Sequence, residues 1–300
     1  MTKIIKITKV TKIRNSLYFY SFLFIFLIFV ISLRQVFSGR LILPQSFSLG
    51  PLTIHYYGII MAAAAAAGFY LAIKRVPRFI SRESAEDLLF WVIVGGFLGA
   101  RLYHVLSSAP YYYQYPLDIL KVWNGGLSIY GAVLGGILAI IVYQRSVSKV
   151  TFDTLDWLAP SVLLGQIIGR FGNLFNYEAF GYPTNLPWKM FVPANFRPVL
   201  YRQFNFFHPW FLYEILGNLV ILLLLLKIVP KFYKKSQAGF IVFFYLLLYN
   251  SLRFCLEFLR IDSTFIGSFR LNALTSLVLI ILSATALLLC RKKSAATATS

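Results

Sequence analysis

The sequence predicts an all-α polytopic membrane protein, and three observations support that prediction. Of its 300 residues, 59% are hydrophobic and only 13% are charged. Several uncharged apolar runs are long enough to cross a hydrocarbon core of ~30 Å as a helix. Lysine and arginine gather in the short segments between these runs, which is the pattern that orients membrane helices. We therefore attribute the formal charge of +19 to the basic residues that orient the membrane helices, and we expect no nucleic-acid partner.

Eight apolar runs are candidate membrane spans. They lie at residues 16–34, 57–73, 88–106, 126–143, 155–168, 210–226, 238–258 and 271–290. The first run follows the basic leader MTKIIKITKVTKIRN, and a leader of this kind stays in the cytoplasm. If the spans alternate from there, the cytoplasmic segments hold 18 of the 29 lysines and arginines. Both termini are then expected on the cytoplasmic side.

Two further segments stand out between and within these runs. Residues 178–209 form the longest stretch between two spans and are rich in proline, asparagine and aromatic residues. We expect them to form a small external head segment. The alanine run MAAAAAAG at 61–68 predicts a smooth helix surface for close packing against another helix.

The stretch GRFGNLFNYEAFG, beginning at Gly169, is unusually polar for its surroundings. On a helix, its polar residues fall at i, i+3, i+7, i+8 and i+11, which is one face. They are Arg170, Asn173, Tyr177, Glu178 and Gly181. A charge at membrane depth costs at least ~2.5–3.5 kcal/mol, so this face is expected to line a cavity or the protein interior.

Two other spans also carry arginine. In YNSLRFCLEFLR, Arg253, Glu257 and Arg260 follow one another at i, i+4 and i+7, and in GGFLGARLYHV the residue Arg101 follows a glycine-rich helix face. Three arginines from three spans thus approach one side of the membrane. An arginine with orienting amides is suited to bidentate binding of phosphate, so a shared anion is the functional interpretation.

Structural interpretations remain open for several of these residues. Arg253 and Glu257 are spaced as an internal ion pair that needs no ligand, and Arg101 is close enough to a span end to reach the interface. The three histidines, His55, His104 and His208, are scattered singly, as structural histidines usually are. Cys255 and Cys290 show no metal or disulfide spacing, so neither a metal site nor a cofactor is expected.

Taken together, the motifs resemble those of the bacterial prolipoprotein diacylglyceryl transferase family. The resemblance rests on GRFGNLFNYEAFG followed by PTNLPW, and on further matches in the same order along the chain, which cover about residues 48–290. These further matches are LGPLTIHYYGI, GARLYHV, WNGGLSIYGAVLGG, HPWFLYE and LRFCLEFLR. The resemblance implies a seven-helix transmembrane core with a small external head domain. Residues 1–40 are then an extra basic leader and hydrophobic helix, expected to be retained, and 41–300 form the transferase domain.

The resemblance also implies an activity. Such enzymes transfer the diacylglyceryl group of phosphatidylglycerol to the lipobox cysteine of a preprolipoprotein signal peptide, forming a thioether and releasing glycerol phosphate. The implied partners are phosphatidylglycerol, the preprolipoprotein and membrane lipid. The implied location is the bacterial cytoplasmic membrane, with the active site toward the outer leaflet.

Site residues are assigned on the positions that match the family motifs. The expected catalytic residues are Arg170, Arg253, Glu178 and Tyr130, and the expected phosphatidylglycerol-binding residues are Arg170, Asn173, Asn176, Gly181, Tyr57, Arg101 and Glu257. Glu178 and Glu257 are expected to hold the arginines. Fixed cations beside a departing phosphate would lower the barrier, each donor contributing ~2.7–4 kcal/mol.

Two departures from the family pattern leave details open. Tyr130 stands where some members have a histidine, and a phenol with an ordinary pKa of ~10 is a poor base for a thiol. The thiol proton could instead go to His104, Glu178 or the departing phosphate. Trp210 and Phe211 in HPWFLYE replace smaller or amide side chains.

Three rival functions are disfavoured by the same sequence. A transporter is disfavoured because no inverted repeat is visible. An intramembrane protease is disfavoured because the chain has neither an HExxH pair nor paired intramembrane aspartates. An inactive scaffold would have little reason to keep all of Arg170, Asn173, Glu178 and Arg253.

Overall fold

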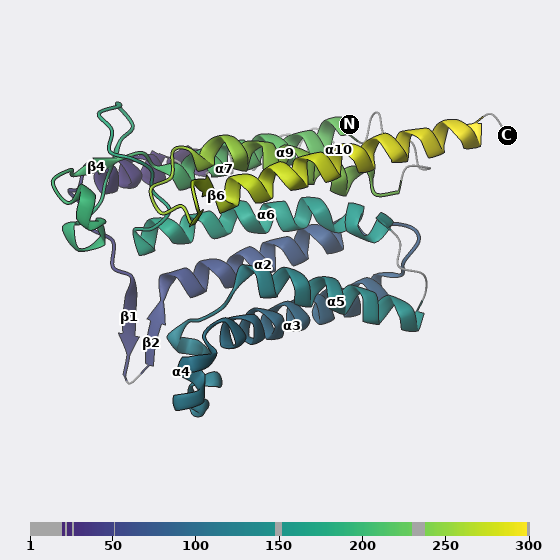
Figure 1. The fold of residues 1–300 in the computed structure, drawn as a ribbon, viewed down its shortest axis with the longest axis horizontal. Helices are drawn as coiled ribbons and strands as arrows, with labels where there is room; N and C mark the ends of the chain where they lie inside the picture. The colour runs from purple at the N-terminus through teal and green to yellow at the C-terminus, as the bar shows by residue number, and fades with distance from the viewer. Residues whose placement is uncertain are drawn as a thin grey trace, which may run out of the picture. The chain divides into compact units, whose positions relative to one another are not determined.

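The computed structural model describes residues 20–298 except 22, 26, 51, 148–151 and 230–237, and it is mainly helical (Figure 1). The chain forms two compact units. The first contains the described residues up to Pro44 together with Tyr177–Pro209, and the second contains Gln45–Asn176 and Trp210–Ser300. Each unit is described by itself below.

The second unit is a bundle of long helices with short hairpins and turns at its ends. Its helices are α2 (Tyr56–Lys74), α3 (Arg82–Ser107), α4 (Ala109–Gln114), α5 (Ile129–Val147), α6 (Phe152–Asn176), α7 (Trp210–Leu223), α9 (Phe240–Glu257) and α10 (Leu271–Ala298). Single turns lie at η1 (Pro116–Ile119) and η2 (Val122–Asn124), and η5 (Leu224–Ile228) continues α7 as a π-helix. Two antiparallel hairpins pair β1 (Ser46–Leu49) with β2 (Leu52–His55), and β5 (Phe265–Ile266) with β6 (Phe269–Arg270).

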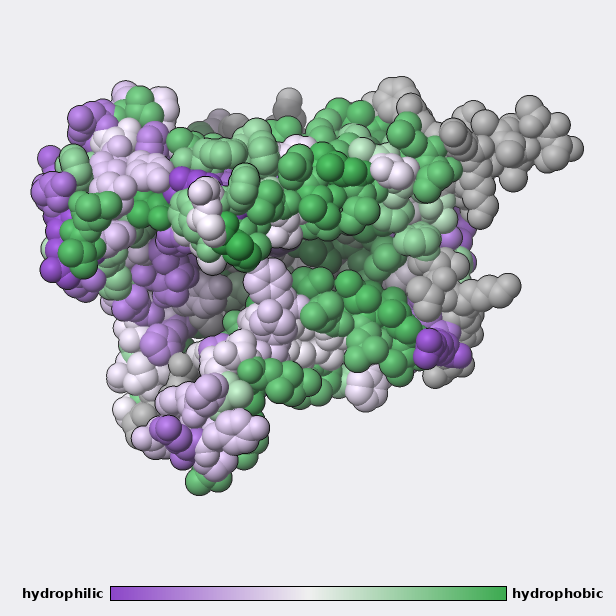
Figure 2. Space-filling view, in the orientation of Figure 1, coloured by the Kyte–Doolittle hydropathy of each residue, from purple (hydrophilic) through white to green (hydrophobic). Residues whose placement is uncertain are grey.

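Five helices are long and apolar enough to cross a membrane. They are Tyr56–Lys74, Arg82–Ser107, Trp210–Ile228, Phe240–Glu257 and Leu271–Cys290, and the shorter apolar helices are Leu23–Phe37 and Ile129–Arg145. Figure 2 shows hydrophobic residues over the helical part of the second unit. These findings confirm a mainly helical, multi-pass chain. Each of the eight predicted spans overlaps a helix, but α6 is not among the five apolar helices and extends well beyond the predicted 155–168.

The helices of the second unit pack in a continuous series. α5 lies on α3 and α2 on α6, while α6 contacts α7 and α9, and α9 contacts α10 (Figure 1). Glycines set the closest approach, because a Cβ at Gly99 or Gly131 would collide with the backbone of the facing helix. Within the alanine run of α2, Ala64 is buried at 3% exposed, which agrees with the predicted close helix packing at that position. Several of its other alanines are exposed.

A buried carboxylate fixes how α9 starts against α6. Both side-chain oxygens of Asp156 accept hydrogen bonds, one from the backbone amide of Gly239 and one from that of Val242, each at 2.8 Å. Asp156 is only 4% exposed. A carboxylate at a helix N-terminus satisfies free N–H groups and complements the helix dipole. Asp156 therefore sets the register of α9, and with it the position of Arg253 farther along.

The first unit folds the predicted head segment around a small core. Its hairpin pairs β3 (Met190–Phe191) with β4 (Phe206–Phe207), and its single turns are η3 (Ala194–Phe196) and η4 (Val199–Tyr201). Met190, Val192 and Phe207 are at most 1% exposed. The apolar helix Leu23–Phe37 also belongs to this unit. Just after it, Gly39 has a φ of +76°, and its lack of a side chain lets its backbone lie against the Phe191 ring.

The predicted helical face of GRFGNLFNYEAFG is correct only in its first part. α6 ends at Asn176, so Tyr177, Glu178 and Gly181 do not continue the face of Arg170 and Asn173. The backbone turns away because Tyr177 and Ala179 have φ values of 50° and 53°. Two contacts hold the Tyr177 side chain in the first unit, a 2.6 Å hydrogen bond from the Leu43 amide to its hydroxyl and a stack on the Phe196 ring.

Candidate active site

Two arginines from different helices share one buried carboxylate at an end of the second unit. Arg170 lies near the end of α6 and Arg253 near the end of α9, while Glu214 lies just after the first turn of α7. Nη2 of Arg170 is 2.8 Å from Oε1 of Glu214, and Nη1 of Arg253 is 3.5 Å from its Oε2. The Glu214 side chain is fully buried. It therefore couples the positions of the two arginines.

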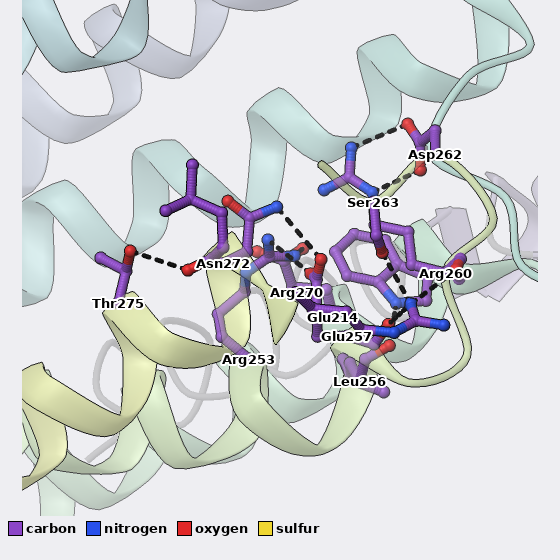
Figure 3. Close-up of polar contacts among 12 residues, drawn as sticks. Glu214, Arg253, Leu256, Glu257, Arg260, Asp262, Ser263, Arg270, Asn272 and Thr275 are labelled. Carbon is purple, nitrogen blue, oxygen red and sulfur yellow. Dashed lines mark hydrogen bonds and ion pairs between the residues drawn. The ribbon is translucent and has the colours of Figure 1, made fainter. Parts of the chain in front are cut away.

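A second buried carboxylate holds Arg253 from its own helix. Oε2 of Glu257 is 3.4 Å from Nη2 of Arg253, as the i, i+4 spacing predicted. The amide of Asn272, at the start of α10, donates to Oε1 of Glu257 at 3.1 Å. Figure 3 shows these side chains converging from α9 and α10. Arg253 is thus fixed between two carboxylates and is only 12% exposed.

The indole ring of Trp210 lies close to three arginines of this cluster. Trp210 is fully buried, and its Nε1 donates to the Leu256 carbonyl at 2.6 Å, which ties the start of α7 to the end of α9. The guanidinium carbons of Arg253, Arg260 and Arg170 lie 4.7, 5.1 and 5.8 Å from its ring centroid. The face of an indole attracts cations, so one ring helps to gather three arginines.

Arg260 follows the last turn of α9 and has its own counter-ion. Its Nε and Nη2 donate to the two oxygens of Asp262 at 2.5 and 2.8 Å. Burial opposes ionisation of Asp262, but the hydrogen bonds from Arg260 outweigh it and hold the pKa of that carboxyl below its ordinary value. This bidentate pair keeps Arg260 oriented toward Trp210.

The charges of the cluster favour an anion. Arg170, Arg253 and Arg260 pair with the carboxylates of Glu214, Glu257 and Asp262. Arg270 donates to backbone carbonyls and to Ser263, so the cluster has one positive charge in excess. Several of the pairings are long: Nη1 of Arg253 and Oε2 of Glu214 form an ion pair at 3.5 Å, but neither atom makes a hydrogen bond in the described structure. A buried N–H group without a hydrogen-bond partner lowers the stability of the fold unless a ligand accepts its hydrogen bond. The arrangement can therefore hold a phosphate beside preset cations.

Arg101 does not belong to this cluster through any contact that the structure describes. Four of its five N–H donors are used by backbone carbonyls of the loop between α4 and α5, at 2.5 to 2.9 Å. These carbonyls belong to Asp118, Ile119, Gly125 and Gly126. Gly126 has φ +76°, and a side chain there would collide with Arg101. The geometry gives Arg101 the role of holding this loop.

A small polar hollow lies beside Arg101. Its volume is about 150 Å³, and His104, Tyr111, Asp118 and Lys121 contribute to its lining. Asp118 accepts from the Tyr111 hydroxyl at 2.6 Å and pairs with the Lys121 ammonium at 2.7 Å. Lys121 and then Tyr111 hold the pKa of the Asp118 carboxyl below its ordinary value. Asp118 therefore neutralises Lys121, while the donors of Arg101 are used by backbone carbonyls.

The remaining predicted site residues are dispersed. Asn173 is buried and lies 3.5 Å from Nη1 of Arg170, and the Tyr57 ring packs where Gly172 lacks a side chain. Tyr130 is 57% exposed, with its ring 6.0 Å from that of Tyr103. Asn176 ends α6 and its carbonyl accepts from Gln45, while Glu178 is exposed and Gly181 bonds the His208 carbonyl, both in the first unit.

The sequence-based assignment missed the most central residue. Glu214 was missed, although a carboxylate near the start of an apolar span carries the same burial cost that drew attention to Arg170. Trp210 and Asn272 were missed as well, since neither is charged. In the described part of the chain, no group of three or more His, Cys, Asp or Glu residues could hold a metal ion.

This fold and this cluster define a multi-pass membrane protein with buried arginines and carboxylates gathered at one end of its helix bundle. The family model described as prolipoprotein diacylglyceryl transferase matches residues 44–289. A phosphatidylglycerol-prolipoprotein diacylglyceryl transferase of Thermotoga petrophila is 42% identical over 282 residues, which cover 92% of this chain and 93% of its own length. Proteins of the same name from Acaryochloris marina and Synechococcus elongatus are 43% and 40% identical, over 78% and 79% of this chain and 86% and 83% of their own lengths. The chain belongs to the prolipoprotein diacylglyceryl transferase family.

The two kinds of match differ at the N-terminus. The family model begins at residue 44. The alignment with the Thermotoga petrophila protein covers 92% of the chain, so it has to include part of residues 1–40. Part of the region before the family core is therefore shared with that relative.

Proposed function

We propose that this protein transfers the diacylglyceryl group of phosphatidylglycerol to the lipobox cysteine of a preprolipoprotein, the first step of lipoprotein maturation. Family membership supports the reaction. The single structural observation that supports it best is the pair Arg170 and Arg253, fixed on Glu214 at one end of the bundle. The reaction needs fixed cations where a phosphate ester leaves.

The chemistry fits these side chains. The cysteine sulfur attacks the glycerol carbon that carries the phosphate, a C–S bond forms, the C–O bond breaks, and glycerol phosphate leaves with the bonding electrons. Negative charge on the phosphate oxygens grows as the bond breaks. Guanidinium groups that are already oriented stabilise that charge without reorganising at the moment of reaction. The thiol proton ends on solvent or on the departing phosphate.

Roles within the site follow from the contacts. Arg170 and Arg253 bind the phosphate, Glu214 and Glu257 hold the two guanidiniums, and Asn173 orients Arg170. Glu178 and Tyr130 are proposed to act on the cysteine-bearing substrate, because both are exposed. Asn176, Gly181 and Tyr57 are proposed lipid-binding residues on the strength of the family motifs. Arg101 is proposed to support lipid binding indirectly, by holding the loop between α4 and α5 rather than by contacting the phosphate.

The proposed setting is the bacterial cytoplasmic membrane. We infer seven spans in the core, formed by α2, α3, α5, α6, α7 with η5, α9 and α10, and a retained additional helix before residue 40. The alignment with the Thermotoga petrophila protein supports this helix, because it includes part of residues 1–40. The cluster then opens toward the outer leaflet, and Tyr177–Pro209 form the external head.

The test is transfer from phosphatidylglycerol to a lipobox peptide in detergent micelles. Wild type is compared with Arg170→Ala, and with Arg82→Ala as a matched control, because Arg82 pairs with Glu86 on the surface and is 74% exposed. Transfer by wild type and Arg82→Ala that collapses in a folded Arg170→Ala protein supports the proposal. No transfer by well-folded wild type would overturn the activity, and equal rates in all three would overturn the site.

A further inference from the structure

The hairpin that joins α9 to α10 carries an apolar tip with no protein partner over most of its surface. Phe265, Ile266 and Phe269 are 54%, 60% and 64% exposed. The register pairs Phe265 with Arg270 and Ile266 with Phe269, so Gly267 and Ser268 form a two-residue turn. Gly267 has φ +58°, the conformation that such a tight turn favours in glycine.

The apolar surface continues into the end of α9. Phe258 and Leu259 are 53% and 36% exposed and precede the hairpin by a few residues. Single exposed apolar side chains need no explanation, but a contiguous group of large ones marks a surface that meets another apolar phase. The five side chains Phe258, Leu259, Phe265, Ile266 and Phe269 are called the apolar wedge below.

The wedge is tied firmly to the arginine cluster. Nη1 of Arg270, in β6, donates to the carbonyls of Glu257 and Arg260 at 2.7 and 3.0 Å and to Oγ of Ser263 at 2.7 Å. Figure 3 shows Arg270 reaching from the hairpin toward Glu257 and Arg260. The guanidinium also lies 5.3 Å from the centre of the Phe265 ring. One side chain thus connects the apolar tip to the cluster, so the two keep a fixed separation.

The flanking helices indicate what covers the wedge. α9 ends at Glu257 and α10 begins at Leu271, and both are apolar enough to span a membrane. A loop this short between two spans has to lie at the edge of the bilayer. Its aromatic and aliphatic side chains fit the acyl boundary, and the arginines connected to the hairpin through Arg270 fit the phosphates of anionic lipid.

We propose that the apolar wedge inserts into the bilayer and thereby holds the arginine cluster at the depth of lipid phosphates. Its occupant is the acyl region of the leaflet. The proposed insertion is inferred only from the hairpin and the two spans that flank it. The consequence for catalysis, that phosphatidylglycerol is presented at the correct height, also rests on the proposed function.

Insertion is tested without any activity measurement. A nitroxide is attached at Ile266→Cys in protein in which Cys255 and Cys290 are replaced by serine, in bilayer nanodiscs containing phosphatidylglycerol. Glu83→Cys, at an exposed position near the start of α3, is the reference for the aqueous phase. We expect position 266 to be relaxed more by oxygen than by a water-soluble nickel complex, and position 83 to show the reverse. Equal access of the nickel complex at both positions would overturn the proposal.

The catalytic consequence is tested with the combined variant Phe265→Ser, Ile266→Ser and Phe269→Ser. We expect KM for long-chain phosphatidylglycerol in nanodiscs to rise at least about fivefold, because buried apolar area is lost, with kcat little changed. Activity on short-chain lipid in micelles should be unaffected. Leu49→Ser is the matched control, since Leu49 is 61% exposed at the tip of a different hairpin and should leave both values unchanged.

The outcomes separate the two proposals. Wild type without transfer activity would overturn the proposed function, while the nitroxide result would still decide insertion. A variant that changed KM for the peptide and not for the lipid would assign the wedge to the signal peptide and overturn lipid as its occupant. If the combined variant did not fold, Ile266→Ser alone would be measured, and an unchanged KM for nanodisc lipid would count against the catalytic consequence.

Discussion

Arg101 and Arg253 have the same side chain and lie in the same bundle, but they are used differently. Arg101 gives four N–H donors to backbone carbonyls of one loop. Arg253 lies between two buried carboxylates at 3.4 and 3.5 Å and keeps a buried nitrogen without a hydrogen-bond partner. An arginine whose donors are consumed by the backbone holds the fold. An arginine held by carboxylates, with donors to spare, is prepared for a ligand.

The largest expected effect is at the cluster arginines. Arg253→Lys and Arg170→Lys keep the charge but lose the planar fork that orients several donors at once. We expect kcat/KM for transfer to fall by about 10²–10³, the loss seen when one preset donor to a developing anion is removed. Steady-state kinetics on folded protein measures this. Activity close to wild type in either variant would show that this arginine does not stabilise the leaving phosphate.

A smaller effect on the reaction is expected from Glu214→Gln. The amide can still bond one arginine but cannot neutralise two, so the guanidiniums shift apart. Because removing one partner of a buried ion pair costs ~3–5 kcal/mol, the melting temperature should also fall. Both rate and thermal unfolding are measured, with Glu86→Gln as a control on the surface pair to Arg82. Full rate with full stability would show that Glu214 does not position the arginines.

Arg101→Lys is expected to affect stability more than chemistry. A lysine cannot reach four carbonyls in one plane, and each lost bond from a charged donor contributes ~1.5–3 kcal/mol. Thermal unfolding should therefore occur at lower temperature, while kcat of the folded fraction stays within about threefold of wild type, well below the effect of one lost oxyanion donor. A folded Arg101→Lys protein with a hundredfold lower kcat would instead place Arg101 in the catalytic site, as its motif predicted.

The smallest expected effect is a pH dependence in the first unit. Burial lowers the pKa of His208, so the folded unit binds a proton less readily than the unfolded chain. Its contribution to stability is then fully present above the unfolded pKa, ~6.5, and declines as pH falls below that value. Thermal unfolding at several pH values, compared with His208→Gln, isolates this contribution. An identical decline in the variant would assign the pH dependence to other groups.

Much of the fold follows from the sequence, because uniform apolar runs specify membrane helices almost by themselves. The pair Arg253 and Glu257 also follows, since both lie on one helix. Glu178 was misplaced relative to Arg170 because periodicity cannot show that Tyr177 and Ala179 adopt positive φ and end the helix. The interaction of Glu214 with two arginines depends on how three helices pack, and no local pattern contains that information. Arg101 was linked to the other arginines because the sequence does not show which carbonyls a loop turns inward.

The most direct test of the central claim is the binding of glycerol phosphate, the product that carries the phosphate, to folded wild type, Arg253→Lys and Arg101→Lys proteins. Isothermal titration at low salt in one detergent gives the three dissociation constants. We expect the Kd for glycerol phosphate to rise at least about tenfold in Arg253→Lys, equivalent to ~1.4 kcal/mol. In Arg101→Lys it should stay within about twofold of wild type. Equal Kd values in Arg253→Lys and wild type, or a larger loss in Arg101→Lys, would contradict the central claim.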